Sequence, residues 1–448
     1  MVTTAEHPTA GKQQVDQLID ARWIIPIEPA NVVLENHSLV IQGDRIFDLL
    51  PTTEAAVRYA GKRHFRLTEH VLMPGLVNLH THAAMSLLRG YADDMPLMRW
   101  LQERIWPAES RNVSADFVHD GTLLACWEML RGGVTCFNDM YFFPQAAAEA
   151  ALNAGMRAAL GITVFEFPSA YGSGAEDYLR KGLAIREALL DESLISFCLA
   201  PHAPYTVADS SFERVAILAD QLDLPIHIHL HETREEIADS LKEHGVRPLE
   251  RLRRLGLLGP GLIAVHAVHL DKDEIGLLAA HGCHVAHCPT SNMKLASGIA
   301  PVGALLDHGV GVGLGSDGAA SNNRLDVFQE MRQAALLAKV ANEDAASLPA
   351  HRALGMATLE GARALGLEEK IGSLRIGKAA DLMAVRLDAW DLQPCYCPAS
   401  HLVYAAGREQ VSHVWVAGAL RIEDKHPVDL DVQALLMNTK MWQNKILI

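Results

Sequence analysis

Eight short apolar runs alternate with helix-like segments through the middle of the chain, and this alternation dominates its hydrophobic pattern. Each run has the length of a buried strand. The predicted strands are Leu76–Leu79, Val134–Asn138, Arg157–Phe165, Ile195–Ala200, Pro225–Leu230, Leu262–Ala267, His284–Cys288 and Val310–Gly315. The helical segments expected between them include Asp116–Arg131, Pro144–Ala154, Ser210–Leu222, Arg247–Leu255, Asp273–His281 and Val302–Asp307. Strand–helix units repeated in this way predict an α/β fold, a (β/α)8 barrel of the TIM type, with an open doubly wound sheet as the competing fold.

Shorter β-type runs flank the barrel region on both sides. On the N-terminal side they are Leu18–Ile27, Ser38–Gln42, Arg45–Leu49 and His64–Leu67, with Gly43-Asp44 as a hairpin turn. On the C-terminal side, β texture returns at 372–385, and Gly418 separates two further runs, His413–Ala417 and Ala419–Ile422. We therefore expect a disordered tail over 1–16, a barrel over 73–370, and a small β-sandwich built from 17–72 and 371–448, the latter including a C-terminal tail.

Composition narrows the possible partners. Of 448 residues, 49% are hydrophobic and 21% are charged, as in an ordinary soluble enzyme. The net charge is −15 and the charges are dispersed, which argues against a nucleic acid or an anionic membrane as partner. The seven cysteines form no C-x-x-C pair, and the N-terminus has no apolar signal segment. A soluble, cytoplasmic protein is expected, and a homo-oligomer is compatible with these features.

Two histidines stand at the end of the first predicted barrel strand. His80 and His82 are two positions apart, so their side chains leave the strand on the same face. Two imidazoles held side by side can bind a borderline metal such as zinc. This pair alone predicts a metal site only weakly, because His-x-His pairs also occur by chance.

The ends of four other predicted strands carry histidine or acid as well. In a barrel of this kind the active site lies at the C-terminal ends of the strands. These ends carry His202, the series His227, His229 and His231, then His266 and His269, and finally Asp317. Five converging strand ends favour a functional site over isolated structural histidines. Spacing does not choose among His227, His229 and His231, because alternation with aliphatic residues puts all three on one face.

Several motifs resemble a known family. His80-Thr-His82, histidines at the fifth and sixth strands, and Asp317 at the eighth resemble the amidohydrolase superfamily, whose members are metal-dependent hydrolases. The His229–Glu232 segment is similar to the branch that deaminates purines and pyrimidines. Further segments resemble the 5-methylthioadenosine/S-adenosylhomocysteine deaminases: Leu88-Arg-Gly, Trp100, Pro107-Ala-Glu109, Pro201-His-Ala-Pro-Tyr205, Ser291–Leu295 and Ser316–Asn323. The resemblance extends from about Trp23 to Val416.

The resemblance implies a role for each residue. One zinc ion, or another divalent metal, would be held by His80, His82, His229 and Asp317. The absence of a lysine at the third or fourth strand end implies a single metal. Asp317 would also take a proton from water, Glu232 would protonate purine N1, and His266 would stabilise the developing charge. For the nucleoside substrate, Glu109 would bind ribose hydroxyls, His202 would contact the nucleoside, and Trp100 would form a wall of the pocket.

Two rival functions remain open from the sequence. One is a related hydrolase acting on guanine or a chloro-s-triazine, and the other is a catalytically inactive scaffold, whose signature would be lost ligands. The loop Glu166–Tyr178 is aromatic, small and acidic, and Arg180 is the first arginine after it. We therefore expect methylthioadenosine to be a better substrate than adenosylhomocysteine, unless Arg180 folds back to bind the carboxylate of the latter.

Overall fold

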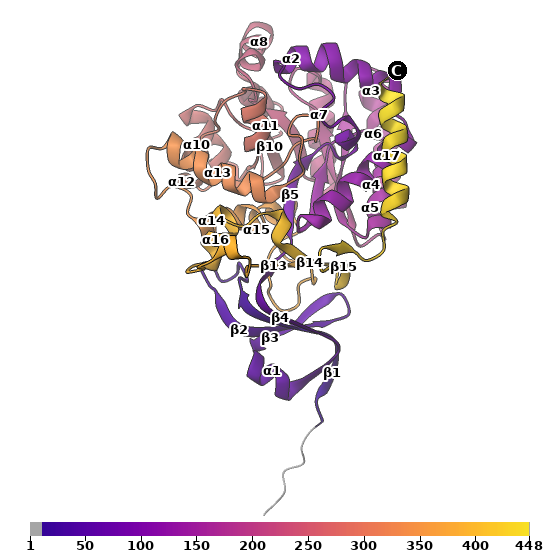
Figure 1. Ribbon diagram of the computed structural model, residues 1–448. Helices are drawn as coiled ribbons and strands as arrows, with labels where there is room; N and C mark the ends of the chain where they lie inside the picture. The colour runs from indigo at the N-terminus through magenta and orange to yellow at the C-terminus, as the bar shows by residue number, and fades with distance from the viewer. Residues whose placement is uncertain (1–10, 448) are drawn as a thin grey trace, which may run out of the picture.

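The structure is a computed structural model and describes residues 11–447 (Figure 1). Eight parallel strands form one sheet in sequence order: β5 (Leu76–Thr81), β6 (Val134–Asp139), β7 (Arg157–Val164), β8 (Ile195–Pro201), β9 (Ile226–Leu230), β10 (Leu262–His266), β11 (His284–His287) and β12 (Gly311–Leu314). The chain after β12 then meets β5, where the Asp317 N–H donates to the His80 carbonyl over 3.0 Å. The predicted barrel is thereby confirmed, with each strand close to its expected bounds.

Helices cover the outside of this barrel. Between β5 and β6 lie η1 (Ala83–Leu88), α2 (Leu97–Trp100), the π-helical turn η2 (Leu101–Ile105), α3 (Trp106–Asn112) and α4 (Ala115–Arg131). The others are α5 (Pro144–Ala154), α6 (Ala175–Ala188), α7 (Asp209–Leu222), α8 (Arg234–His244), α9 (Pro248–Arg254), α10 (Lys272–Ala280), α11 (Pro289–Lys294), α12 (Val302–Asp307), α13 (Val327–Ala341), α14 (Ala350–Met356) and α15 (Leu359–Ala364). Side-chain caps define several starts, as where the Ser114 hydroxyl accepts the Phe117 N–H. The helical segments predicted from sequence are all present.

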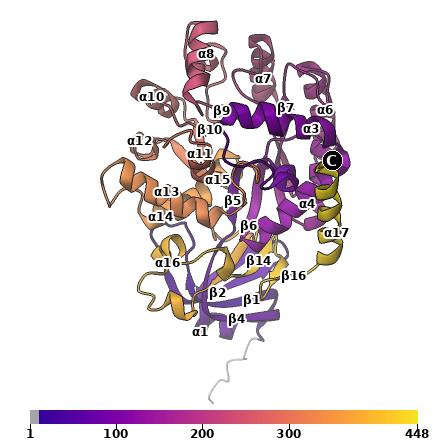
Figure 2. The ribbon, with the colours of Figure 1, turned by 45° about the horizontal axis from the view of Figure 1, so that its top comes forward.

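A second sheet combines the two ends of the chain, as predicted. Its order is β16 (His426–Pro427), β15 (Ala419–Glu423), β14 (Val411–Val416), β13 (Leu382–Arg386), β4 (Tyr59–Pro74), β1 (Gln13–Ile24), β2 (Leu34–Gln42) and β3 (Arg45–Pro51). Strand β1 pairs parallel with β4, while the other neighbours are antiparallel. The sheet encloses one apolar cluster that includes Ile19, Ile41 and Trp415. Figures 1 and 2 show this sheet at one end of the barrel and α8 at the other.

Both predicted hairpin turns are present, and they touch each other. Gly43 joins β2 to β3, and Gly418 joins β14 to β15. Gly418 has a φ of +74°, and a Cβ at this position would lie 2.3 Å from the Gly43 carbonyl oxygen. Glycine is required there both by the left-handed backbone and by the close approach.

The expected tail boundaries need correction at both ends. Strand β1 already begins at Gln13, inside the segment expected to be a disordered tail, because Val15 is buried and the strand pairs with β4. Residues 1–10 lie outside the described residues. At the other end, the C-terminal tail expected after the last strands contains helix α17 (Val432–Ile446), and helix α16 (Pro398–Tyr404) lies between β13 and β14. Helix α17 packs along α4 (Figure 1). Between the two helices, Trp442 is buried against Phe117 and donates to Asp120 over 2.8 Å.

A buried ion pair joins the two sheets. Arg157, at the start of β7, lies with its Nε 3.0 Å from one Asp381 oxygen and its Nη2 3.2 Å from the other. Asp381 immediately precedes β13 and also accepts the Ala417 N–H over 2.8 Å. Only 3% and 1% of the two side chains are exposed.

Among the described residues, no helix is long and apolar enough to cross a membrane.

Replacing Asp381 by asparagine should strongly destabilise the protein. The change keeps the size of the side chain but leaves the Arg157 guanidinium buried without a counter-charge. The expected loss in free energy of unfolding, measured by urea titration, is about 3–5 kcal/mol. Glu69→Gln is a matched control because the Arg22–Glu69 pair is about half exposed, at 48% and 47%. This control should change the free energy by less than about 1 kcal/mol, and equal losses in the two variants would contradict the prediction.

Candidate active site

A cavity of about 660 Å³ opens at the C-terminal ends of the barrel strands. Its walls come from the segment between β5 and α4, from the loops after β6, β7, β8 and β9, and from the chain after β12. Polar groups on its wall include His82, Glu109, His202, His229, Glu232, His266 and Asp317. Much of the remaining wall is apolar or aromatic, with Leu97, Trp100, Leu101, Ile105, Phe142, Phe165 and Phe167 among its residues. Every residue expected to bind substrate or to act in catalysis therefore lines one cavity.

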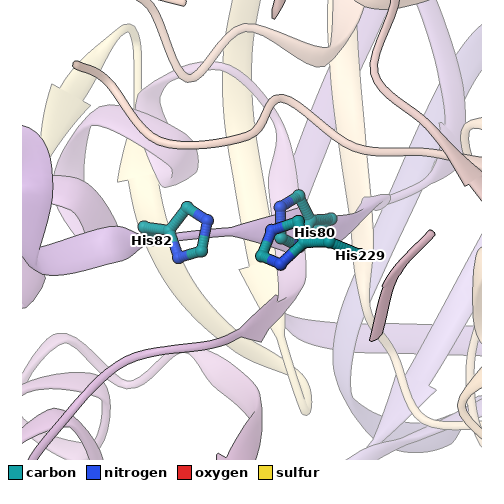
Figure 3. A group of neighbouring side chains, drawn as sticks. All are labelled: His80, His82 and His229. Atoms are coloured by element: carbon teal, nitrogen blue, oxygen red, sulfur yellow. The ribbon is translucent and has the colours of Figure 1, made fainter. Parts of the chain in front are cut away.

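Three histidines from two strands meet in the barrel (Figure 3). His80 and His82 lie at the end of β5, and His229 lies on β9. One ring nitrogen from each lies within 4.8 Å of the others. In a second group, ring nitrogens of His80 and His266 and a carboxylate oxygen of Asp317 also lie within 4.8 Å of one another. The Asp317 Oδ1 atom is 3.3 Å from His80 Nε2 and 3.4 Å from His82 Nε2. This arrangement of imidazoles and one carboxylate has the composition of a catalytic zinc site.

Hydrogen bonds on the outer side of the rings fix which nitrogen faces the centre. The Nδ1 of His82 lies 2.6 Å from the Met140 carbonyl, and that of His229 lies 2.8 Å from the His202 carbonyl. A carbonyl oxygen only accepts, so both Nδ1 atoms carry the proton and both Nε2 atoms keep a lone pair. The Nε2 of His80 is buried and makes no hydrogen bond among the described residues. Two ring nitrogens with lone pairs and a buried His80 Nε2 without a hydrogen-bond partner fit a metal ion.

Asp317 is held from two sides. The hydroxyls of Ser291 and Ser321 donate to its Oδ2 atom over 2.6 and 2.7 Å, and the Gly318 N–H donates to Oδ1 over 2.7 Å. Burial alone would raise the pKa of Asp317, but its contacts with His80 and the nearby His82 hold that pKa well below its ordinary value. The carboxylate is therefore ionised and directs Oδ1 toward the histidines.

The three histidines of the fifth strand were expected on one face, but they do not share one. His227 and His229 both point inward, but His227 Nε2 lies 3.0 Å from His80 Nδ1 and so supports that ring from behind. His231 follows the end of β9 and has a φ of +55°, which turns its ring away from the cavity. The Leu249 N–H donates to its Nε2 atom over 3.1 Å. Alternation failed as a guide here because the extended backbone stops at Leu230.

Glu232 and His266 face each other across the cavity. The Glu232 Oε2 atom lies 3.7 Å from His266 Nε2. Burial raises the pKa of Glu232 above its ordinary value, which favours a protonated carboxyl. The Nδ1 of His266 lies 2.9 Å from the Asn292 side-chain oxygen, and this contact fixes the ring. The pair therefore combines a carboxyl group of raised pKa with an oriented imidazole.

The three residues expected at the nucleoside line the same cavity. Glu109 accepts the Tyr141 hydroxyl over 2.6 Å, and burial raises the pKa of its carboxyl. His202 stacks on Phe165 with ring centroids 4.8 Å apart, and its pKa is lowered to about 3 by burial. Trp100 donates its indole N–H to the Ala92 carbonyl over 2.9 Å, leaving its ring as wall.

Sequence reasoning missed several residues that orient these groups. Tyr141, which binds Glu109, follows the end of β6, so a check of that strand end could have found it. Ser291, Asn292 and Ser321 lie in quoted motifs, but nothing in their spacing assigned them to Asp317 or His266. Arg180 is exposed and pairs with Asp177, and it does not line the cavity.

Comparison with known proteins identifies the family. The sequence model of the Amidohydrolase family matches residues 71–421, and the chain belongs to this family. Among its relatives, the 5-methylthioadenosine/S-adenosylhomocysteine deaminase of Teredinibacter turnerae is 47% identical over 96% of this chain and 98% of that protein. The crystal structure of an adenosine deaminase from Xanthomonas campestris with bound zinc is 49% identical, with a TM-score of 0.96 over 97% of this chain and 99% of the other.

A more distant structure shares the fold alone. Atrazine chlorohydrolase from Arthrobacter aurescens, complexed with zinc, is 24% identical, with a TM-score of 0.87 over 95% of this chain and 100% of that chain. At that identity the barrel and its attached sheet correspond, whereas the reaction is a property of the particular side chains in the cavity.

Metal retention should depend on His229 more than on its neighbour His227. His229→Ala removes a nitrogen that faces the centre, so purified protein should lose its metal and its activity together. His227→Gln, which keeps a polar group behind His80, should retain the metal with an affinity lowered by no more than roughly 10–100-fold. Metal content by elemental analysis and competition with a chelator measure both effects. If His227→Gln lost the metal and His229→Ala retained it, the metal ligand would be His227 and not His229.

Proposed function

We propose that this protein is a zinc-dependent deaminase that hydrolyses 5′-methylthioadenosine at purine C6 to the inosine derivative and ammonia. S-adenosylhomocysteine and adenosine would be further substrates. The observation that carries the proposal is the position of Glu232 and His266 beside the His80–His82–His229–Asp317 cluster, in a cavity that also presents Glu109. The names of the similar proteins agree with this activity.

One metal ion per chain is part of the proposal. The two groups of ligand atoms found among the described residues share His80, which supports a single site. When bound, a divalent ion supplies Lewis acidity that lowers the pKa of water to about 7. The chain's own residues then have to place the water, the purine and the protons.

Asp317 and His266 act on the water side of the reaction. Two serine hydroxyls occupy Oδ2 of Asp317, whereas Oδ1 accepts one N–H, that of Gly318, and faces the histidines; Oδ1 would therefore accept the proton from the attacking water. The contact of His266 Nδ1 with the Asn292 oxygen places a ring proton on Nδ1, so the doubly protonated ring would donate from Nε2 to the reacting oxygen and stabilise the charge that develops on it. The proton taken by Asp317 then goes to the departing amine, which leaves as ammonia.

Glu232 acts on the purine side. Burial raises its pKa, which favours the protonated form, and the protonated carboxyl would give its proton to N1 as water adds to C6. Protonation of N1 draws electrons away from C6, which makes C6 more electrophilic and favours the addition of water there. As the amine leaves, the proton of the hydroxyl on C6 restores the acid, and the product keeps the proton on N1.

The rest of the nucleoside would be held by the cavity wall. The Glu109 carboxylate, oriented by Tyr141, would accept hydrogen bonds from ribose hydroxyls. His202 would contact the nucleoside from beside Phe165, and Trp100 would close one wall. A site of this kind is mostly apolar, with a few polar groups that fix the orientation of the ligand.

Glu232→Gln separates the acid from the metal site. The variant keeps the size of the side chain but cannot donate the proton to N1. We expect kcat for methylthioadenosine to fall by roughly 10²–10⁴-fold, while the metal content stays at the wild-type value. Ultraviolet absorbance and ammonia release measure the rate. A kcat near that of the wild type would exclude ring protonation by Glu232.

The 5′ substituent should decide the substrate preference. Among the described residues that line the cavity none is lysine or arginine, and three are acidic: Glu109, Glu232 and Asp317. The carboxylate of adenosylhomocysteine would lose water there without gaining a cation, whereas a thiomethyl group gains apolar contacts. We expect kcat/KM to be at least roughly tenfold higher for methylthioadenosine.

Side-by-side assays test this preference. The panel comprises methylthioadenosine, adenosylhomocysteine, adenosine, guanine and a chloro-s-triazine, so that the competing reactions are measured together. Equal kcat/KM values for the first two, with adenosylhomocysteine activity abolished by Arg180→Ala, would show that Arg180 reaches the substrate. Turnover of guanine or the triazine alone would overturn the proposed function.

A further inference from the structure

The turn between β9 and α8 places Glu232 in the cavity. Strand β9 ends at Leu230, and α8 begins at Arg234. Between them His231 adopts a φ of +55°, a left-handed conformation that costs a non-glycine residue energy and persists only where neighbours hold it. The kink sends the His231 ring away from the cavity and the Glu232 side chain into it. Contacts with neighbouring residues are needed to hold the His231–Glu232 backbone in this conformation.

The orientation of the Glu232 carboxyl group is not fixed by hydrogen bonds of its own. Its carboxyl group makes no hydrogen bond to the described residues, and its contact with His266 is 3.7 Å long. Such a group is free to donate a proton to a substrate, but its direction depends on the backbone that carries it. The precision of the acid is therefore set by whatever fixes the His231–Glu232 backbone.

The side chain of Glu236 contacts this backbone. Thr233 is the N-cap of α8 and accepts the Glu236 N–H over 3.2 Å, so Thr233 to Glu236 has the Thr-x-x-Glu spacing of a capping box. In a usual capping box the glutamate returns to the N–H of the N-cap itself. Here Glu236 reaches further back, accepting the His231 N–H at Oε1 over 3.0 Å and the Glu232 N–H at Oε2 over 2.8 Å.

We propose that Glu236 is a positioning residue for the reaction, holding the kinked His231–Glu232 backbone so that the Glu232 carboxyl is aimed at the substrate. This inference rests on the proposed function. Glu236 is buried, is absent from the cavity wall, and uses both carboxylate oxygens on the two residues that form the kink. Its place in the first turn of α8 also suits a negative charge at a helix N-terminus.

A carboxylate fits this position and an amide does not. Each oxygen of a carboxylate accepts, so one glutamate satisfies two N–H groups. Glutamine would offer one oxygen and one NH₂ group, and the latter would face a backbone N–H as donor against donor. Burial raises the pKa of Glu236 to about 7, while the two N–H groups oppose that rise because they favour the ionised form.

Glu236→Gln tests the proposal by changing those acceptors at nearly constant volume. We expect kcat for methylthioadenosine to fall roughly 10–100-fold with KM and metal content unchanged, since a misplaced acid slows proton transfer more than binding. Hydrogen exchange at the His231 and Glu232 amides should accelerate. Glu235→Gln, an exposed neighbour with the same charge change, should match the wild type in every measurement.

A second variant separates positioning from helix capping. Thr233→Ala removes the N-cap but leaves the Glu236 contacts, so it should lower Tm while kcat stays within about twofold. The proposal is overturned if Glu236→Gln lowers Tm alone with wild-type kcat and unchanged amide exchange. A wild-type protein inactive on methylthioadenosine counts against the proposed function instead, and the exchange measurement still decides the role of Glu236.

Discussion

The hydrogen bond from the Asp317 amide to the His80 carbonyl is the constraint on which the site depends. It joins the chain after β12 to β5 and so closes the barrel. The same two residues contribute a carboxylate and an imidazole to the metal-binding cluster, which makes barrel closure and ligand spacing one geometric condition. Gly315 permits it, because a Cβ there would lie 2.9 Å from the His80 nitrogen. The pattern Gly313-Leu-Gly315 thus reflects the close contact between strands.

Burial sets the electrostatic character of the cluster. Removal from water lowers the pKa of His80 to about 4, and it places the pKa of His229 well below the ordinary value. The imidazoles of His80 and His229 are therefore neutral, and Asp317 is the charged member of the group. The same burial raises the pKa of Glu232, so the two carboxyl groups of one site are shifted in opposite directions. Environment, and not residue type, divides the two roles.

Much of the fold and site could be predicted from sequence because the information is local. Apolar runs mark the barrel strands, and polar residues at their ends mark the site, as His80 and Asp317 illustrate. What could not be predicted depends on contacts between distant segments. Tyr141 meets Glu109 across 32 positions, and Ser291 meets Asp317 across 26. His231 was misplaced because a single left-handed residue interrupts the alternation of a strand.

The docking of α17 has a consequence for the order in which the protein becomes complete. This helix contacts α4, α3 and η1, and α3 carries Glu109. The wall that would receive the ribose is thus braced by residues 432–446, which leave the ribosome after every strand of the barrel. The wall near Glu109 is therefore complete only when the last helix of the chain has been synthesised, whereas the strands that carry the clustered histidines are synthesised earlier.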